Sequence, residues 1–309
     1  MTDIITYPTP VAGRDLYDRE YPPLVYDVDG IVVHGTLFML AGRPKSGKSW
    51  LLLQLARAID EEREWLGAPT YRHGRLLYIA LEDGERRVWE RIHAMAWKPQ
   101  HADFLFDLPP LAEGGREAIT YYASQYSVII LDTLRAALGA TDENNNTEIS
   151  TVLIPLARDI HERGSTLIVS HHTGKSYSEE YTFESIRGAS AIRGSYDGGA
   201  VLVRPHGERR ATLYCESRDL ETRDLSLEWC GPKEGWTLLG SHDEIRMREL
   251  LEALNAFGGE ATAAQVASVL GVGEDRARQR LRAAVNAGML RVAQQETNGR
   301  GRPRVVYRL

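Results

Sequence analysis

At residues 42–49 the chain carries Gly42-Arg43-Pro44-Lys45-Ser46-Gly47-Lys48-Ser49, which fits the pattern G-x-x-x-x-G-K-[ST] of a phosphate-binding loop. The apolar run 36–41 before it predicts a buried strand, and the leucine-rich run 50–59 after it predicts a helix. This order directs main-chain N–H groups and a helix N-terminus at a polyphosphate. A chance match in a surface turn is the alternative, and the flanking elements disfavour it. The stretch therefore predicts a P-loop, or Walker A, nucleotide site.

Each residue type in the loop has an expected task. Gly42 and Gly47 allow backbone turns that a side chain would block. Lys48 is expected to place its charge on the outer phosphates, and the Ser49 hydroxyl to bind Mg²⁺. The predicted cofactors are therefore ATP and Mg²⁺. The predicted nucleotide-binding residues are Gly42, Pro44, Lys45, Ser46, Gly47, Lys48, Ser49 and Trp50.

Composition limits the classes of protein to consider. The 309 residues are 43% apolar and 26% charged, as in a water-soluble globular protein with one large and one small domain. No apolar run approaches the ~20 residues of a membrane span, so no membrane partner is expected. Cys215 and Cys230 are the only cysteines and lack a metal-ligand spacing, which favours a reducing, cytoplasmic location.

Charge is unevenly distributed along the chain. The formal net charge is −6, which argues against coating by nucleic acid along the whole molecule. Residues 242–309 carry eleven arginines and eight acidic residues, a balance of +3, while the rest of the chain carries 26 basic and 35 acidic residues. A basic C-terminal module on an acidic body indicates a localised anionic partner.

Two acidic residues follow or end predicted buried strands. The run 74–81 precedes Glu82, and the run 126–132 ends in Asp132. Ligands of open α/β sheets bind where parallel strands end, so Glu82 is a candidate general base for water and Asp132 a candidate Mg²⁺ residue at the Walker B position. Glu82 has an alternative role as a strand-end carboxylate that caps the next helix, and Asp83 is expected to do that capping.

Two histidines and a polar loop follow the next predicted strand, 166–170. His171 or His172 could register the γ-phosphate by hydrogen bonding, and the alternative is that at least one of them fills a polar core contact. Residues 173–198 are too long for a plain connector. Within them, Lys175, Arg187 and Arg193 could contact nucleic-acid phosphates, with a solvated loop as the alternative.

The remaining pattern predicts an α/β fold with a mostly parallel central sheet. Residues 1–23 form an irregular lead-in, 24–240 the main domain and 241–309 a second, small domain. A Gly-, Asp- and Asn-rich loop is expected at 138–147. Further helices are predicted at 85–97, 116–124 and 148–163, and further strands at 103–106, 200–204, 210–216, 225–229 and 236–239.

Over roughly residues 24–240 the chain resembles the RecA-like P-loop ATPases, and most of all the RepA-like hexameric replicative helicases of plasmids and phages. The resemblance is carried by 41–49, Leu81-Glu82-Asp83, Leu131-Asp132-Thr133 and His171-His172-Thr173-Gly174-Lys175. It implies that Lys48 and Ser49 bind phosphate and Mg²⁺, Glu82 activates water, Asp132 supports Mg²⁺ and His172 senses the γ-phosphate.

The same resemblance implies that an arginine of a neighbouring subunit completes the catalytic site. The matching position is Arg218, with Arg204 as second choice. Related helicases carry a lysine two residues before this arginine, where this chain has Glu216. Such an arginine stabilises transition-state charge and contributes ~10³–10⁵ in rate. A homo-oligomer, and specifically a hexamer, is therefore expected.

Residues 244–309 resemble the winged-helix family. Three helices are predicted, with Thr262 capping the second and the third at 274–287, followed by strands at 289–292 and 304–308. The third helix would expose Arg276, Arg280 and Arg282 to a DNA major groove, and the hairpin tip would bring Arg300 and Arg302 to the backbone or minor groove. A winged helix used for protein contacts is the alternative.

Two functions follow from these patterns. The first is an ATP-driven DNA helicase or translocase that encloses single-stranded DNA in a hexameric ring. The second is a nucleotide-switched DNA-binding regulator or partition-type ATPase, whose winged helix recognises duplex DNA. Other RecA-like roles, in recombination or signalling, remain open because fold alone does not license function.

Overall fold

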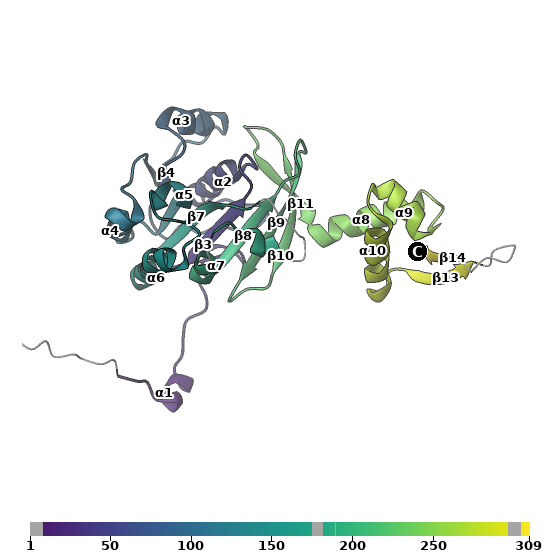
Figure 1. Ribbon diagram of the computed structural model, residues 1–309, viewed down its shortest axis with the longest axis horizontal. Helices are drawn as coiled ribbons and strands as arrows, with labels where there is room; N and C mark the ends of the chain where they lie inside the picture. The colour runs from purple at the N-terminus through teal and green to yellow at the C-terminus, as the bar shows by residue number, and fades with distance from the viewer. Residues whose placement is uncertain (1–8, 175–181, 189, 296–303) are drawn as a thin grey trace, which may run out of the picture.

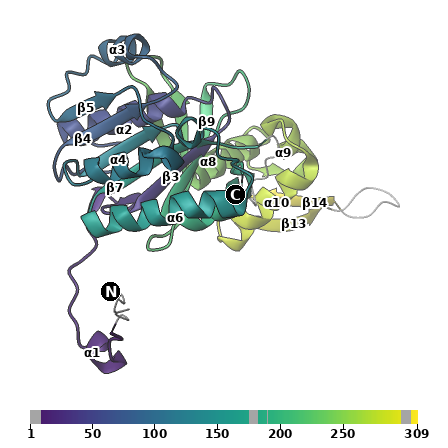
Figure 2. The same cartoon turned by 60° about the vertical axis from the view of Figure 1, so that its left-hand side comes forward.

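The computed structural model describes residues 9–174, 182–188, 190–295 and 304–309. A large sheet covered by helices forms the main body, and helix α8 leads from it to a smaller C-terminal body (Figure 1). The short N-terminal helix α1 (Gly13–Tyr17) lies away from both bodies in the two ribbon views (Figures 1 and 2).

The main body follows the predicted alternation of strands and helices. Its strands are β1 (Tyr26–Val28), β2 (Val32–Val33), β3 (Leu37–Gly42), β4 (Leu76–Ala80), β5 (Ala102–Leu105), β6 (Val128–Asp132), β7 (Thr166–His172), β8 (Gly198–Val203), β9 (Arg210–Ser217), β10 (Arg223–Trp229) and β11 (Trp236–Ser241). Its helices are α2 (Lys48–Glu61), α3 (Glu85–Ala94), η1 (Leu111–Glu113), α4 (Gly115–Tyr122), α5 (Leu134–Leu138), α6 (Asn146–Arg163), η2 (Thr182–Ser185) and α7 (Ser190–Ser195).

Nine strands form the central sheet in the order β11-β10-β9-β8-β3-β7-β6-β4-β5. From β8 to β5 the strands are parallel, whereas β9, β10 and β11 extend the sheet antiparallel. This is the predicted α/β architecture with a mostly parallel sheet. Strand β7 lies between the P-loop strand β3 and the Asp132 strand β6.

Both faces of the sheet are covered, which explains why its central strands are apolar throughout. Side chains alternate along β3: Phe38 and Leu40 belong to the core beneath α2, while Leu37 and Met39 belong to the core beneath α6. Gly164, with φ +61°, ends α6 in the left-handed conformation expected of a C-cap glycine.

Strand direction assigns the ends of these strands to two edges of the sheet. The carboxyl ends of β3, β4, β6 and β7 share one edge, because the four strands are parallel. Strand β9 runs the other way, with Ser217 opposite Gly198 at the start of β8. Arg218 therefore lies at the edge opposite the P-loop.

The structure corrects several predicted boundaries. Helix α3 ends at Ala94 rather than residue 97, and β7 continues to His172, so both histidines belong to the strand. The loop expected at 138–147 is shorter, since α5 and α6 occupy its two ends. Residues 173–198 include η2 and α7 and are not one continuous loop.

In its described residues the C-terminal body contains the helices α8, α9 and α10 and a small antiparallel sheet (Figure 2). Thr262 caps the second helix through a reciprocal bond pair with Gln265. A separate apolar core, including Leu254, Val266 and Leu281, holds this body together. The domain boundaries and the winged-helix assignment stay predictions. The elements are α8 (His242–Asn255), β12 (Glu260–Ala261), α9 (Ala263–Leu270), α10 (Glu274–Asn286), β13 (Arg291–Gln295) and β14 (Arg304–Arg308), with the sheet order β12-β14-β13.

Among the residues that the structure describes, no helix is both long enough and apolar enough to cross a membrane.

Candidate active site

The P-loop glycines are required by close packing as well as by backbone conformation. Gly47 has φ +105°, and a Cβ there would lie 2.8 Å from Cζ2 of Trp236. At Gly42, which needs no positive φ, a Cβ would lie 2.8 Å from the Leu202 carbonyl oxygen. The loop is therefore pressed against β8 and β11.

Lys48 is buried beneath the loop. Its Nζ donates to the carbonyl oxygens of Gly42, at 2.9 Å, and Arg43, at 3.2 Å, and lies 3.4 Å from Nδ1 of His172. Burial lowers the pKa of Lys48 from 10.5 to about 8, although the negative charges of Asp132 and Glu82 oppose this shift. A polyphosphate would restore the preference for the charged ammonium.

The loop contains one buried polar atom that fits an anionic ligand. Ser46 is 4% exposed, and its Oγ has no hydrogen-bond partner among the described residues. Buried hydroxyl groups normally have a partner, so this atom fits a site built to contact phosphate. Pro44 and Lys45 are exposed and Ser49 is partly buried around the same pocket.

Asp132 is held rigidly at the end of β6. It is 4% exposed and accepts hydrogen bonds from Tyr78 Oη, at 3.0 Å, and from Ser170 Oγ. Burial, with the neighbouring Asp132 charge, raises the pKa of Tyr78 well above its usual value, so Tyr78 remains a donor. Both Asp132 oxygens already accept a bond, which fits contact with Mg²⁺ through water together with Ser49.

Glu82 is directed toward the pocket and does not cap α3. Its Oε1 accepts a 2.7 Å hydrogen bond from Thr133 Oγ1, and its side chain is 48% exposed. The capping role expected for Asp83 is wrong: Gly84 is the N-cap, with no side-chain cap bond. Asp83 instead pairs with Arg87, at 2.7 Å, and Arg91, because these residues lie one and two turns along α3.

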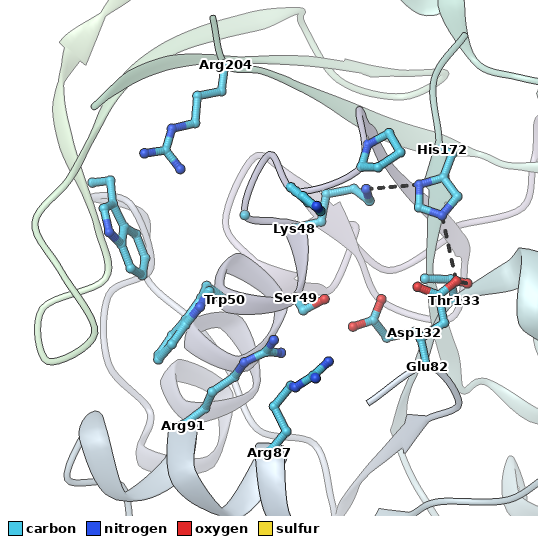
Figure 3. Close-up of a pocket in the computed structure, with 14 residues that line it drawn as sticks. Lys48, Ser49, Trp50, Glu82, Arg87, Arg91, Asp132, Thr133, His172 and Arg204 are labelled. Carbon is cyan, nitrogen blue, oxygen red and sulfur yellow. Dashed lines mark hydrogen bonds and ion pairs between the residues drawn. The ribbon is translucent and has the colours of Figure 1, made fainter. Parts of the chain in front are cut away.

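His172 connects Lys48 and Glu82 (Figure 3). Lys48 donates to its Nδ1, which leaves the proton on Nε2, 3.7 Å from Glu82 Oε1. Burial and the Lys48 charge lower the pKa of His172, so the ring is a neutral donor at neutral pH. His171 is fully buried and donates through Nε2 to the Arg187 carbonyl oxygen at 2.9 Å, which is the core contact considered as its alternative role.

These groups surround a pocket of about 630 Å³ at the carboxyl edge of the parallel strands. Residues 8–178, which include the P-loop, Glu82, Asp132 and both histidines, match the family described as "AAA domain". The chain belongs to this family. It is accordingly an ATPase of the P-loop class, and nucleotide binding, usually with Mg²⁺, goes with that class.

A second comparison is much more limited. The chain is 42% identical over 57 residues to "Pleiotropic drug resistance protein 1" of Petunia axillaris and to its namesake in Petunia hybrida. The matched stretch is 18% of this chain and spans 4% of each Petunia protein. That share is too small to transfer an activity or a partner.

One wall of the AAA-domain pocket joins the predicted Trp50 to residues that the sequence did not indicate, Trp229 among them. Trp50 and Trp229 meet edge to face with ring centroids 5.3 Å apart, and Trp229 meets Trp236 at 5.5 Å. The guanidinium of Arg91 lies 5.4 Å from the Trp50 ring, and that of Arg204 lies 5.1 Å from Trp236. Trp50 has a local signal, since it follows Ser49, but Trp229 is 179 residues further along the chain.

The two candidate arginines occupy different places. Arg204 follows β8 and lines the pocket of its own chain, where its Nε donates to the Glu208 carbonyl oxygen at 2.7 Å (Figure 3). Arg218 is exposed at the opposite edge, 3.3 Å from Asp197. Within one chain, therefore, only Arg204 is near the P-loop, and Arg218 would act only on another subunit.

The predicted nucleic-acid residues that the structure describes are divided between the main body and helix α10. Arg187 pairs with buried Glu143 at 2.8 Å, and Arg193 is exposed on α7. On α10, Arg276 and Arg282 are exposed, but the prediction that Arg280 is exposed is wrong. The Arg280 side chain is only 17% exposed and lies 3.8 Å from Glu249, because α10 packs against α8 there. Lys175, Arg300 and Arg302 lie outside the described residues.

Proposed function

We propose that this AAA-domain ATPase is a DNA motor, a helicase or translocase that works as a hexameric ring in plasmid or phage replication. The observation that carries the proposal is the chain of contacts from Lys48 through His172 to Glu82 at the pocket mouth. Glu82 is positioned to accept a proton from water, and neutral His172 can report to Glu82 whether a phosphate occupies the Lys48 site. Such a link is what a motor needs to couple nucleotide state to movement.

The position of Arg218 supports hydrolysis at subunit interfaces. In a ring, each contact is heterologous, so one edge of a subunit meets a different edge of its neighbour. Arg218 lies at the edge opposite the pocket, where such a contact would present it to the next P-loop. Arg204 would then serve the nucleotide within its own chain.

The tryptophan wall fits the nucleobase. Trp50 and Trp229 bring apolar rings to a pocket that is otherwise charged, beside the phosphate-binding loop. Stacking on aromatic rings binds every base through its π-face, at about 1–3 kcal/mol per base. We expect ATP binding with modest discrimination between bases.

DNA would be bound at two places. The ring proposal assigns single-stranded DNA to the segment 173–198, with Arg187 and Arg193. The C-terminal body has the order of helices and hairpin of a winged helix, and α10, with exposed Arg276 and Arg282, would enter the major groove.

The test of this proposal mixes two inactive variants, Lys48→Ala and Arg218→Ala. We expect each to hydrolyse ATP at under ~1% of the wild-type rate, since either change removes charge from the transition state. Mixed subunits should regain activity and strand displacement, because some interfaces then hold both an intact P-loop and Arg218. Arg204→Ala is the matched control: it acts within its own chain, so mixing with Lys48→Ala should restore nothing.

A fully active Arg218→Ala protein, or mixtures that never recover, would contradict the shared site.

The second candidate is a nucleotide-switched DNA-binding regulator. One observation favours it: Trp236 at the start of β11 donates to the Gly47 carbonyl oxygen at 3.3 Å, and β11 runs directly into α8. Nucleotide binding at the P-loop could thus change the C-terminal body. A sequence-specific duplex footprint that depends on ATP, without strand displacement, would select this function.

A further inference from the structure

A cluster of one carboxylate and two imidazoles lies away from the P-loop pocket. Asp27 comes from β1, His34 follows β2, and His73 precedes β4. One ligand atom of each residue lies within 4.8 Å of the other two. We propose that these three side chains bind a structural Zn²⁺ ion.

The distances are close to those of a zinc site. His34 Nδ1 is 2.9 Å from Asp27 Oδ1, and His73 Nε2 is 4.0 Å from the same oxygen. Zn²⁺ with ligands at about 2.0–2.1 Å places neighbouring tetrahedral ligands about 3.3–3.4 Å apart. The two histidines therefore need only small rotations about their side-chain bonds.

The carboxylate is oriented in advance. Thr166 Oγ1 accepts from Gly35 N at 2.8 Å and donates to Asp27 Oδ2 at 2.5 Å. That bond occupies Oδ2 and leaves Oδ1 facing the two imidazoles. Hydrogen bonds of this kind, which hold a metal ligand in place, are the usual surroundings of zinc sites.

A fourth ligand and a route for the ion are also present. The Tyr26 carbonyl oxygen, now hydrogen-bonded to His73 Nε2 at 2.7 Å, can complete a tetrahedron if the two atoms move apart by roughly 0.6 Å. Asp27 has no exposed surface, whereas the side chains of His34 and His73 are 18% and 29% exposed. Imidazole and carboxylate ligands in this number suit Zn²⁺ better than the oxygen-preferring Mg²⁺.

Charge explains why a cation belongs here. Asp27 is fully buried, and within the described residues its ion-pair neighbours are these two histidines, with no lysine or arginine. A buried carboxylate is costly unless it is paired. The metal would join the β1–β2 hairpin to the segment before β4. A 3.0 Å hydrogen bond from Tyr71 N to the Asp27 carbonyl oxygen already connects that segment to β1.

The test is a titration of metal-stripped, nucleotide-free full-length protein with Co²⁺, followed by visible absorption, and with Zn²⁺, followed by thermal unfolding. Wild type should bind one equivalent with the intense spectrum of tetrahedral Co²⁺, and Zn²⁺ should raise the Tm by roughly 5–10 °C at a hundredfold excess over Kd. His73→Ala should lose binding, and Thr166→Val should weaken it about 10–100-fold.

His161→Ala is the matched control, because His161 is also paired with a single carboxylate, Asp197 at 2.9 Å, but belongs to no three-ligand cluster within the described residues. It should bind Co²⁺ like wild type. Metal held instead at Asp132 in the P-loop pocket would survive His73→Ala. If His73→Ala binds as well as wild type, or wild type shows no 1:1 tetrahedral spectrum at millimolar Co²⁺, the three residues form a hydrogen-bonded network only and the proposal is overturned.

Discussion

Burial sets the chemistry of Lys48. Lys48 is 6% exposed, and among the described residues its ammonium bonds to two carbonyl oxygens and one imidazole nitrogen. The protein thus holds a poorly solvated cation where a polyphosphate would sit, and ligand binding relieves a desolvation cost that folding imposed. The same argument applies to Ser46, whose buried Oγ has no partner among the described residues. Both buried groups lower the stability of the nucleotide-free chain, and both are positioned to contact phosphate.

This cost predicts a pH dependence. The pKa of Lys48 is about 8 in the folded chain and near 10.5 when unfolded. Between these two pH values the unfolded chain holds a proton that the folded chain has lost, so the free energy of unfolding rises with pH. Below pH 8 Lys48 is charged in both states, and the folded chain bears the full desolvation cost of its ammonium. The free energy of unfolding of nucleotide-free wild type, measured in urea, should rise by up to about 2 kcal/mol between pH 7.0 and pH 9.5 relative to that of Lys48→Met. A constant difference between the two proteins would show that Lys48 keeps its proton.

At the scale of elements, the pocket is assembled from two kinds of strand. The parallel strands β3, β4, β6 and β7 bring the phosphate and hydrolysis groups to one edge. The antiparallel β10 and β11 add Trp229 and Trp236, and Gln54 of α2 fixes this hairpin by bonds to both the N–H and the carbonyl oxygen of Trp236. Because different strands supply the phosphate-binding groups and the tryptophans, we expect that a mutation can weaken base binding without affecting phosphate binding.

Trp229→Ala should weaken ATP binding about tenfold, because it removes a stacking surface. It should leave the affinity for inorganic triphosphate unchanged, since that ligand has no base. Isothermal titration with both ligands checks this, and Trp89→Ala, an exposed tryptophan on α3 outside the pocket lining, is the control. Equal losses for ATP and triphosphate would mean that Trp229 supports the loop instead.

On helix α10, Arg282 is exposed and Arg280 is largely buried, so we expect substitutions at the two positions to have different effects on DNA binding and on stability. Arg282→Ala should lower affinity for duplex DNA and reduce the slope of log K against log salt by about one, as expected for a lost phosphate contact. Arg280→Ala should keep that slope and lower the melting temperature, because Arg280 is packed against Glu249. Fluorescence anisotropy at several salt concentrations distinguishes the two. A reduced slope for Arg280→Ala would assign it to the DNA surface.

At the scale of the whole molecule, the ATPase body and the C-terminal body have separate cores. The two core clusters of the main body include no residue beyond Trp236, and the third cluster begins at Leu250. The link between them is α8, where Glu249 lies 3.6 Å from Arg210 of β9 and 3.8 Å from Arg280 of α10. Glu249 thus has polar contacts on both sides of α8 while the apolar cores stay separate, which suits signalling more than joint folding.

Removal of residues 242–309 should leave a folded ATPase body. The truncated chain should bind ATP with wild-type affinity and unfold cooperatively, because its cores are intact, and it should lose duplex DNA binding. Circular dichroism, calorimetry and anisotropy measure these three properties. The separate fragment 242–309 should bind the duplex by itself, and failure of both pieces to fold would show that α8 unites one cooperative core.

The sequence by itself determined most of the strands and helices of the main body, the P-loop and the strand-end residues. Parallel strands bring their carboxyl ends to one edge, so Lys48, Glu82, Asp132 and the histidine pair could be placed together from local pattern, while the choice of His172 came from the family resemblance. Helix ends marked by Thr262 and Gly164 were equally predictable, because capping is local.

Only the tertiary structure decided which residues far apart in the sequence become neighbours. Strand order and direction place Trp229 and Arg204 in the pocket and Arg218 at the opposite edge of the sheet. Packing of separate segments also brings Asp27, His34 and His73 together. It also turned Arg280 against Glu249, away from the surface where helical spacing had placed it. Periodicity shows which side of an element is apolar, but the neighbour that covers it depends on packing between segments far apart in the chain.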